Sequence, residues 1–183
     1  MQIIDLRSDN PKAIEQAASM LVSAFRVHWP NAWPDMQSAL KEVEEATQPG
    51  RIARAAIDED GSVVGWIGAI SAYDGHAWEL HPLVVRLDLQ GKGVGKALVE
   101  DLEQQVKLHG GGTIYLGTDD EDSMTTLADK DLYDDIPGIL ANIRNLKNHP
   151  YEFYLKQGFS IVGVIPDANG NGKPDIIMAK RVR

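Results

Sequence analysis

Apolar residues recur with the period of an α-helix in two segments of the chain. In residues 14–25 they stand at i, i+3, i+4, i+7, i+8 and i+11, shortly after an asparagine-proline pair that is typical of a helix start. In residues 94–106 they recur every four residues. We therefore predict two amphipathic helices, each with one face packed on a sheet.

Shorter apolar segments, bounded by turn residues, indicate strands. These segments are residues 3–6, 52–57, 63–70, 78–85, 113–116, 159–165 and 175–179. Two shorter helices are expected at residues 36–45 and 150–157, the second of which Gly158 ends. Since the chain has no internal repeat and no linker, we expect one α/β (α+β) domain with a mixed sheet of about seven strands covered by helices.

The amino-acid composition excludes several classes of protein function. The chain has 183 residues, which is the usual size of one domain, and it has no cysteine, so disulfides, thiolate metal sites and a cysteine nucleophile are excluded. It has no apolar run of membrane-spanning length and no signal-peptide pattern, so we expect a cytoplasmic protein without a membrane partner. The net charge of −9 argues against binding to nucleic acid.

A glycine-rich turn joins a predicted strand to a predicted helix. Residues 90–96 read Gln-Gly-Lys-Gly-Val-Gly-Lys and lie between strand 78–85 and the helix that starts near Val94. Backbone N–H groups of such a turn, together with the positive end of a helix dipole, make an anion site. The motif is not a Walker loop, because Ala97 stands where that loop needs Ser or Thr, and its glycine spacing differs from the dinucleotide fingerprint. A plain helix cap built from small residues is the alternative.

The pattern Gln90-x-x-Gly93-x-Gly95 resembles the acetyl-CoA pyrophosphate loop of the GCN5-related N-acetyltransferase (GNAT) superfamily. The resemblance implies a single N-acetyltransferase domain over residues 1–183, with a central, mostly antiparallel sheet. It also implies acetyl-CoA as cosubstrate, without a metal. The coenzyme contacts that it implies are Leu83, Val84, Val85, Gln90, Gly91, Lys92, Gly93, Val94, Gly95, Lys96 and Tyr154.

The strand before the glycine turn contains Pro82. Because proline donates no ladder hydrogen bond, it indicates a bulge or an edge, and a bulge here turns the N–H of Leu83 away from the sheet. The resemblance implies that this N–H binds the thioester carbonyl and then stabilises the oxyanion of the tetrahedral intermediate.

Glu79 and His81 alternate on the same strand, so both point to one face. A glutamate between apolar neighbours needs a cation or a functional use. Glu79 could bind the ammonium group of a substrate and take its proton through water, provided that burial raises its pKa above about 4.3. Two roles stay open for His81, the more usual structural histidine or a catalytic base.

Tyr154 stands in the segment Phe-Tyr-Leu-Lys-Gln-Gly-Phe of residues 153–159, which matches a Phe-Tyr-x-x-x-Gly-Phe pattern of the superfamily. The resemblance implies that this tyrosine lies beside the coenzyme sulfur. A phenol can hydrogen-bond or protonate a departing thiolate. Considered without the resemblance, Tyr154 is an ordinary core tyrosine.

Four further segments together resemble the chromosomal type of aminoglycoside 6′-N-acetyltransferase. They are residues 78–85, 114–120, 149–154 and 166–170 with 173–175. The resemblance implies direct acetylation of the 6′-amino group of aminoglycosides, antibiotic resistance, a homodimer, and catalytic roles for Glu79, Leu83 and Tyr154. One position departs from the pattern. Many relatives have an asparagine where this chain has Lys147, so no coenzyme contact is assigned there.

An acidic segment could receive a polycationic acceptor. Residues 118–135 hold eight carboxylates and one lysine, and so seven of the nine net negative charges. Asp119 and Asp120 directly follow a strand and are the best placed of these carboxylates, and Asp135 completes the predicted set. A solvated acidic loop is the alternative interpretation.

Trp29 and Trp33 lie in a polar segment that two prolines keep out of the helix. They are either lids on the core or flat walls for the sugar rings of an acceptor. Two other functions stay open, a GNAT enzyme that acetylates polyamines or basic protein amines, and a non-catalytic acetyl-CoA sensor. Glu79 and Tyr154 argue against the sensor, because a sensor needs neither a base nor an acid.

Overall fold

The computed structural model describes residues 1–182, which form two compact units, Met1–Ile114 with Val182 and Tyr115–Arg181. The chain contributes seven strands to one mixed sheet, in the order β1-β2-β3-β4-β5-β7-β6. The predicted α/β class and its seven-stranded sheet with flanking helices are therefore confirmed. That residues 1–183 act as one N-acetyltransferase domain stays a prediction. Within residues 1–182, no helix has both the length and the apolar character to cross a membrane.

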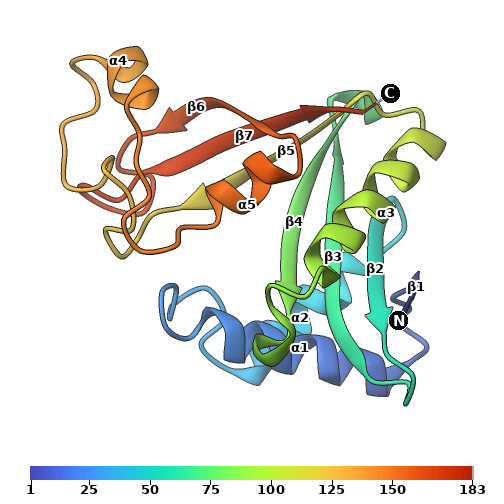
Figure 1. Ribbon diagram of the computed structural model, residues 1–183. Coiled ribbons are helices and arrows are strands. Elements are labelled where there is room, and N and C mark those ends of the chain that lie inside the picture. The colour runs from blue at the N-terminus through green and yellow to red at the C-terminus, as the bar shows by residue number, and fades with distance from the viewer. Residues whose placement is uncertain (183) are drawn as a thin grey trace. The chain divides into compact units, whose positions relative to one another are not determined.

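The first unit contains most of the sheet (Figure 1). Its elements are β1 (Gln2–Asp5), α1 (Pro11–Phe25), α2 (Met36–Ala46), β2 (Arg51–Ile57), β3 (Val63–Ala72), β4 (Ala77–Val85) and α3 (Val94–Leu108), followed by the start of β5 (Thr113–Asp119). Single 3₁₀ turns at Tyr73–Gly75 and Leu87–Leu89 flank β4. Strands β1 to β4 are neighbours in sequence order, and each adjacent pair is antiparallel.

Local sequence explains where the first two helices begin. The side chain of Asn10 accepts a hydrogen bond from the N–H of Ala13, and Pro11 occupies the first helical position of α1. Helix α2 begins with a capping box, in which the Asp35 side chain accepts from the N–H of Ser38 and the Ser38 hydroxyl returns to Asp35. Both helices start within a residue of their expected positions.

Helices cover both faces of this part of the sheet. Trp66 is fully buried on one face, in a core built with α1 and α2, and its Nε1–H donates to the carbonyl of Ala17 at 3.1 Å. On the opposite face, a Cβ atom built on the neighbouring Gly65 would lie 3.1 Å from Leu98 and from Val94 of α3. Because adjacent residues of a strand face opposite ways, α1 and α2 pack on one side of β3 and α3 packs on the other (Figure 1).

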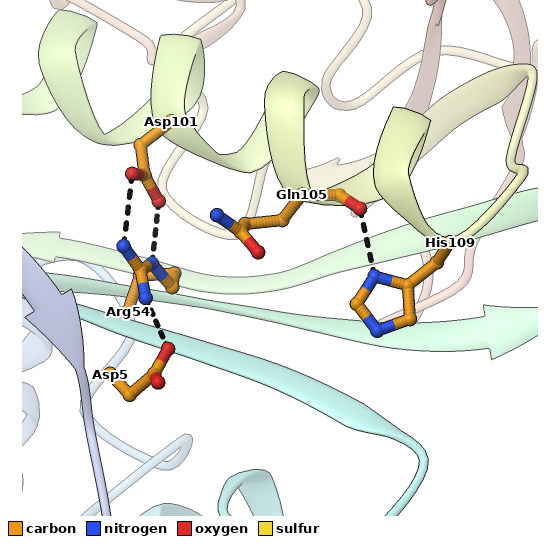
Figure 2. A network of polar contacts seen from close by, with 5 residues as sticks. All are labelled: Asp5, Arg54, Asp101, Gln105 and His109. Carbon is orange, nitrogen blue, oxygen red and sulfur yellow. Dashed lines mark hydrogen bonds and ion pairs between the residues drawn. The ribbon is translucent and has the colours of Figure 1, made fainter.

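A partly buried arginine links α3 to β1 and β2. Figure 2 shows Arg54 of β2 between Asp101 of α3 and Asp5 of β1. Its guanidinium donates to both oxygens of Asp101, at 2.7 and 3.1 Å, and to Asp5. Burial alone would lower the pKa of Arg54, but the hydrogen bonds and charges of the two aspartates outweigh it and raise the pKa. The network holds the helix on its strands next to the apolar contacts.

The second unit contains the remainder of β5, α4 (Ile136–Ala141), α5 (Tyr151–Lys156), β6 (Ser160–Ile165) and β7 (Asp175–Arg181). Strands β6 and β7 form the predicted antiparallel hairpin. Helix α5 ends at Lys156, and Gly158 follows its C-cap residue Gln157 with a φ of +86°, which suits glycine. The predicted loop after β5 is present, but it is followed by the short helix α4, which we did not predict.

Candidate active site

Strand β4 carries a bulge at Pro82, as predicted. Ile67 of β3 pairs with Leu83, and the next paired residue of β3, Ala69, faces Leu80. Two residues of β4, His81 and Pro82, therefore oppose one residue of β3, and the peptide bond between them is cis.

The residue opposite this bulge is Gly68, which the sequence analysis did not single out. A Cβ atom at this position would lie 2.5 Å from the carbonyl oxygen of His81. That distance is far below van der Waals contact, and the obstructing atom belongs to the backbone. A glycine in the interior of a predicted strand was the signal that could have revealed this close approach.

Glu79 and His81 alternate with the buried residues Trp78 and Leu80, so they lie on one face of β4. On that face, Nε2 of His81 lies 3.6 Å from an Oε atom of Glu42 in α2. The ring of Trp33 lies beside the imidazole, with 5.9 Å between the ring centroids.

Glu42 was missed in the sequence analysis, because a single sequence does not show which side chain of a helix meets which strand position. The side chain of Glu42 is 18% exposed and that of His81 is 43% exposed. The contact with Glu42 and the charges of Glu42 and Glu79 raise the pKa of His81, against the opposing effects of burial and of Arg51. Burial acts to raise the pKa of Glu42, but His81, Arg51 and the Trp33 side chain outweigh it, and the pKa is lowered. An ionised carboxylate and a readily protonated imidazole therefore lie together beside Glu79.

The two tryptophans pack differently from each other. Trp33 makes an edge contact with Phe25 at 4.6 Å between centroids, and it also reaches His81. Trp29 contacts Phe25 at 5.6 Å and His28 at the same separation. Trp33 is therefore both a cover for the α1–α2 core and one wall of the Glu42–His81 cluster.

The glycine turn has a backbone conformation that glycine adopts without strain. Gly91 and Gly93 have φ values of +72° and +91°, and no atom lies within 4 Å of a Cβ built on either residue. Helix α3 follows at Val94, and no side chain caps its first turn. The N–H groups of that turn are thus available to an anionic ligand.

Tyr154 is a buried residue of α5. It is 8% exposed, and its ring packs against Phe153 and Phe159 at centroid distances of 5.1 and 5.6 Å. Burial raises the pKa of the phenol, which therefore stays protonated at all physiological pH values. A phenol in this state can donate a hydrogen bond.

The acidic segment after β5 is more ordered than a solvated loop. Asp120 is fully buried, and its two oxygens accept the N–H groups of Met124 and Thr125 at 2.6 and 2.8 Å. These bonds give Asp120 a structural task, because both oxygens already hold the turn together. That Asp120 also contacts an acceptor stays a prediction, and the geometry does not favour it.

The other two predicted carboxylates are less buried than Asp120. Asp119 accepts a hydrogen bond from Asn169, while its backbone carbonyl contacts Nε2 of the buried His149 at 3.0 Å. Asp135 is exposed and caps α4 through the N–H of Gly138 at 3.0 Å. Both keep exposed surface at which a cation could bind.

A family model described as the acetyltransferase (GNAT) family matches residues 14–127, which is more than half of the chain. The chain therefore belongs to the GNAT family of acetyltransferases. It is also similar to solved structures over its whole length. A crystal structure of an aminoglycoside 6′-N-acetyltransferase complexed with coenzyme A is 47% identical, with a TM-score of 0.92, and the match covers 100% of this chain and 98% of that one.

Two more structures extend this similarity. The aminoglycoside 6′-N-acetyltransferase from Enterococcus faecium is 45% identical with a TM-score of 0.88, and an aminoglycoside 6′-acetyltransferase type Ii is 42% identical with a TM-score of 0.75. Each match covers 100% of this chain and 98% of the other. A search of curated proteins found no match.

Proposed function

We propose that this protein transfers the acetyl group of acetyl-CoA to the 6′-amino group of aminoglycosides, and so confers resistance to them. The observation that carries the proposal is the similarity, over the whole chain, to aminoglycoside 6′-N-acetyltransferases at 42–47% identity. One of those structures contains coenzyme A. A cytoplasmic location, where acetyl-CoA is made, and a homodimer belong to the same proposal.

The coenzyme half of the mechanism uses the segment that runs from β4 into α3. Backbone N–H groups within residues 90–95 bind the pyrophosphate, because the glycines allow close approach and the uncapped helix start favours a negative charge. The N–H groups of Gln90 and Lys92 are the exceptions, since they donate to the carbonyls of Leu87 and Leu89. The N–H of Leu83, the first residue after the bulge, donates to the thioester carbonyl. It then stabilises the oxyanion that forms there, a contribution of about 3 kcal/mol for one such donor. The backbone of Val84 and Val85 lines the path of the coenzyme arm, while the Val84 side chain is buried in the core with α1 and α2.

The acceptor half needs negative charge and a site for one proton. Glu79 binds the 6′-ammonium group. One proton of that group passes to water, and the neutral amine then attacks the thioester carbon. As the C–S bond breaks, the protonated phenol of Tyr154 donates a hydrogen bond to the departing sulfur. Asp119 and Asp135 supply charge for the remaining ammonium groups, with Trp29 or Trp33 as a wall for a sugar ring.

The experiment that tests this function is an acceptor panel. The protein is incubated with acetyl-CoA and one amine at a time (aminoglycosides, polyamines or basic peptides), and the released thiol is measured. We expect kcat/KM to be highest for aminoglycosides. A preference for polyamines or peptides would be consistent with the GNAT family but would contradict aminoglycosides as the acceptor. Coenzyme binding without turnover of any amine would indicate a sensor.

A further inference from the structure

Glu42 belongs to none of the motifs that identify the family, yet its side chain forms an ion pair with His81. Its carboxylate comes from α2 and lies 3.6 Å from Nε2 of the imidazole on β4. This separation is short enough for an ion pair but longer than a good hydrogen bond. Catalytic contacts are often this long before substrate binds, and they shorten in the complex.

The stability of the fold gives little reason for this pair. His81 is nearly half exposed, and partly exposed ion pairs contribute little to folding. The core of α2 is built from the apolar side chains of Ala39, Val43 and Ala46, which are buried without help from Glu42. What the carboxylate does determine is the state of the imidazole. With Glu42 facing Nε2, the neutral ring carries its proton on Nε2 and presents a lone pair at Nδ1.

We propose that Glu42 is a positioning residue for acetyl transfer, which holds the His81 ring beside Glu79 so that Nδ1 takes the proton of the acceptor ammonium. This inference rests on the proposed function, and it leaves Glu79 as the ligand of the ammonium group. One N–H bond of the ammonium breaks, and its electron pair stays on nitrogen for the attack on the thioester carbon. The proton joins the Nδ1 lone pair, directly or through a bridging water, and later passes to solvent.

The charges around His81 suit this task. Glu42 of α2, Glu79 of β4 and Arg51 of β2 act on the ring, so two carboxylates oppose one guanidinium. This balance favours a proton on the ring when no acceptor is bound. An ammonium group bound at Glu79 offsets that negative charge and favours release of the ring proton. Binding of the acceptor therefore prepares the imidazole to accept the next proton, and Glu42 keeps the resulting imidazolium stable.

The first test measures the contact in the protein alone. NMR signals of the His81 ring are followed through a pH titration in the parent, in Glu42→Gln and in Glu44→Gln, with His81→Gln used to assign the signals. Glu44 is the matched control, because it is exposed on the same helix and loses the same charge. We expect the His81 midpoint to fall by about one pH unit in Glu42→Gln and to stay unchanged in Glu44→Gln. An unchanged His81 midpoint in Glu42→Gln overturns the inference, regardless of how active that variant is.

The second test measures the reaction with an aminoglycoside. In Glu42→Gln we expect kcat at neutral pH to fall about tenfold while the KM for acetyl-CoA stays the same, and the pH profile of kcat/KM to move to lower pH with the His81 midpoint. In a His81→Gln background, the same change at Glu42 should have no further effect, since its action runs through the ring. Melting temperatures show whether each variant is folded.

Two outcomes overturn the positioning role even if the midpoint shifts. One is an unchanged kcat in Glu42→Gln, and the other is an equal loss of kcat with and without His81. Failure of the proposed function gives a different result. A parent protein that acetylates no aminoglycoside overturns both the function and the role of Glu42 in it, while the NMR titration still reports whether the pair exists.

Discussion

Asp120 and Glu42 are both acidic residues with little exposure, yet their surroundings give them different tasks. Both oxygens of Asp120 accept backbone N–H groups, so its charge is used inside one turn of the chain. Glu42 faces an imidazole and, through it, the face of β4 that carries Glu79. The sequence analysis ranked Asp120 high because it follows a strand and overlooked Glu42, since neither backbone partners nor helix-to-strand contacts can be seen in a single sequence.

Asp120→Asn should destabilise the protein. The amide keeps one oxygen acceptor but turns an NH₂ group toward the second backbone N–H, so one charge-assisted hydrogen bond is lost. We expect the free energy of unfolding to fall by about 2 kcal/mol, as measured by urea denaturation. Asp119→Asn is the control, because its side chain accepts from an exposed asparagine side chain and should matter much less. A stable Asp120→Asn protein with a raised aminoglycoside KM would instead make Asp120 an acceptor ligand.

Tyr154→Phe should slow the chemical step and leave coenzyme binding nearly unchanged. The ring contacts with Phe153 and Phe159 survive the change, whereas the O–H donor is lost. We expect kcat to fall about tenfold, the effect of one hydrogen bond made mainly in the transition state. Because burial raises the pKa of this phenol, the parent should show no loss of activity from tyrosine ionisation up to about pH 9. An unchanged kcat would remove Tyr154 from the mechanism.

The element that organises the site is the segment from β4 through the glycine turn into α3. Its strand, turn and helix could be predicted because each depends on local pattern, namely a proline inside a strand, closely spaced glycines and an apolar residue every four positions. The bulge was predicted for the same reason. The requirement for glycine at position 68 was not predicted. It arises because β4 lies close to this residue, and the register between β3 and β4 is known only from the folded structure.

Gly68→Ala should disrupt the bulge. The added methyl group would lie 2.5 Å from the backbone oxygen of His81, which cannot move without shifting β4. We expect a loss of about 3 kcal/mol in the free energy of unfolding, the upper end of overpacking costs, together with a large fall in kcat. Gly163→Ala in β6 is the matched control, because nothing lies within 4 Å of its added Cβ. Equal melting temperatures for the two variants would show that β4 tolerates the methyl group.

Gly93→Val tests the glycine turn. At a φ of +91° a branched side chain is strained, and its atoms would also obstruct an anion approaching the backbone N–H groups. We expect the KM for acetyl-CoA to rise at least about tenfold while the KM for the aminoglycoside changes little. Gly110→Val, just after α3, should cause similar strain at φ +79° with equally open surroundings, but without the effect on acetyl-CoA. Intact coenzyme affinity in Gly93→Val would argue for a plain helix cap.

For the whole molecule, the fold class and the family could be predicted better than the structure of individual loops and short helices. Periodicity gave the helices and strands, and the motifs gave the family to which the chain belongs. Helix α4 was missed because six residues with a proline and a glycine carry too little helical pattern. The acidic segment is a loop, as predicted, but its residues Met124, Leu127 and Leu132 are buried, which its charge did not indicate. The density of negative charge identified this segment, but it did not show which of its carboxylates accept hydrogen bonds from the protein itself.

The central claim is that the protein acetylates the 6′-amino group of aminoglycosides, and a matched pair of acceptors tests it most directly. The two aminoglycosides should differ only at the 6′ position, where one has an amine and the other a hydroxyl group. Thiol release from acetyl-CoA is measured for both at equal concentration. The account predicts turnover of the amine, with the acetyl group on the 6′ nitrogen by NMR of the product, and at least about a hundredfold lower kcat/KM for the hydroxyl compound. Equal rates for the two compounds, or acetylation at another nitrogen, would contradict it.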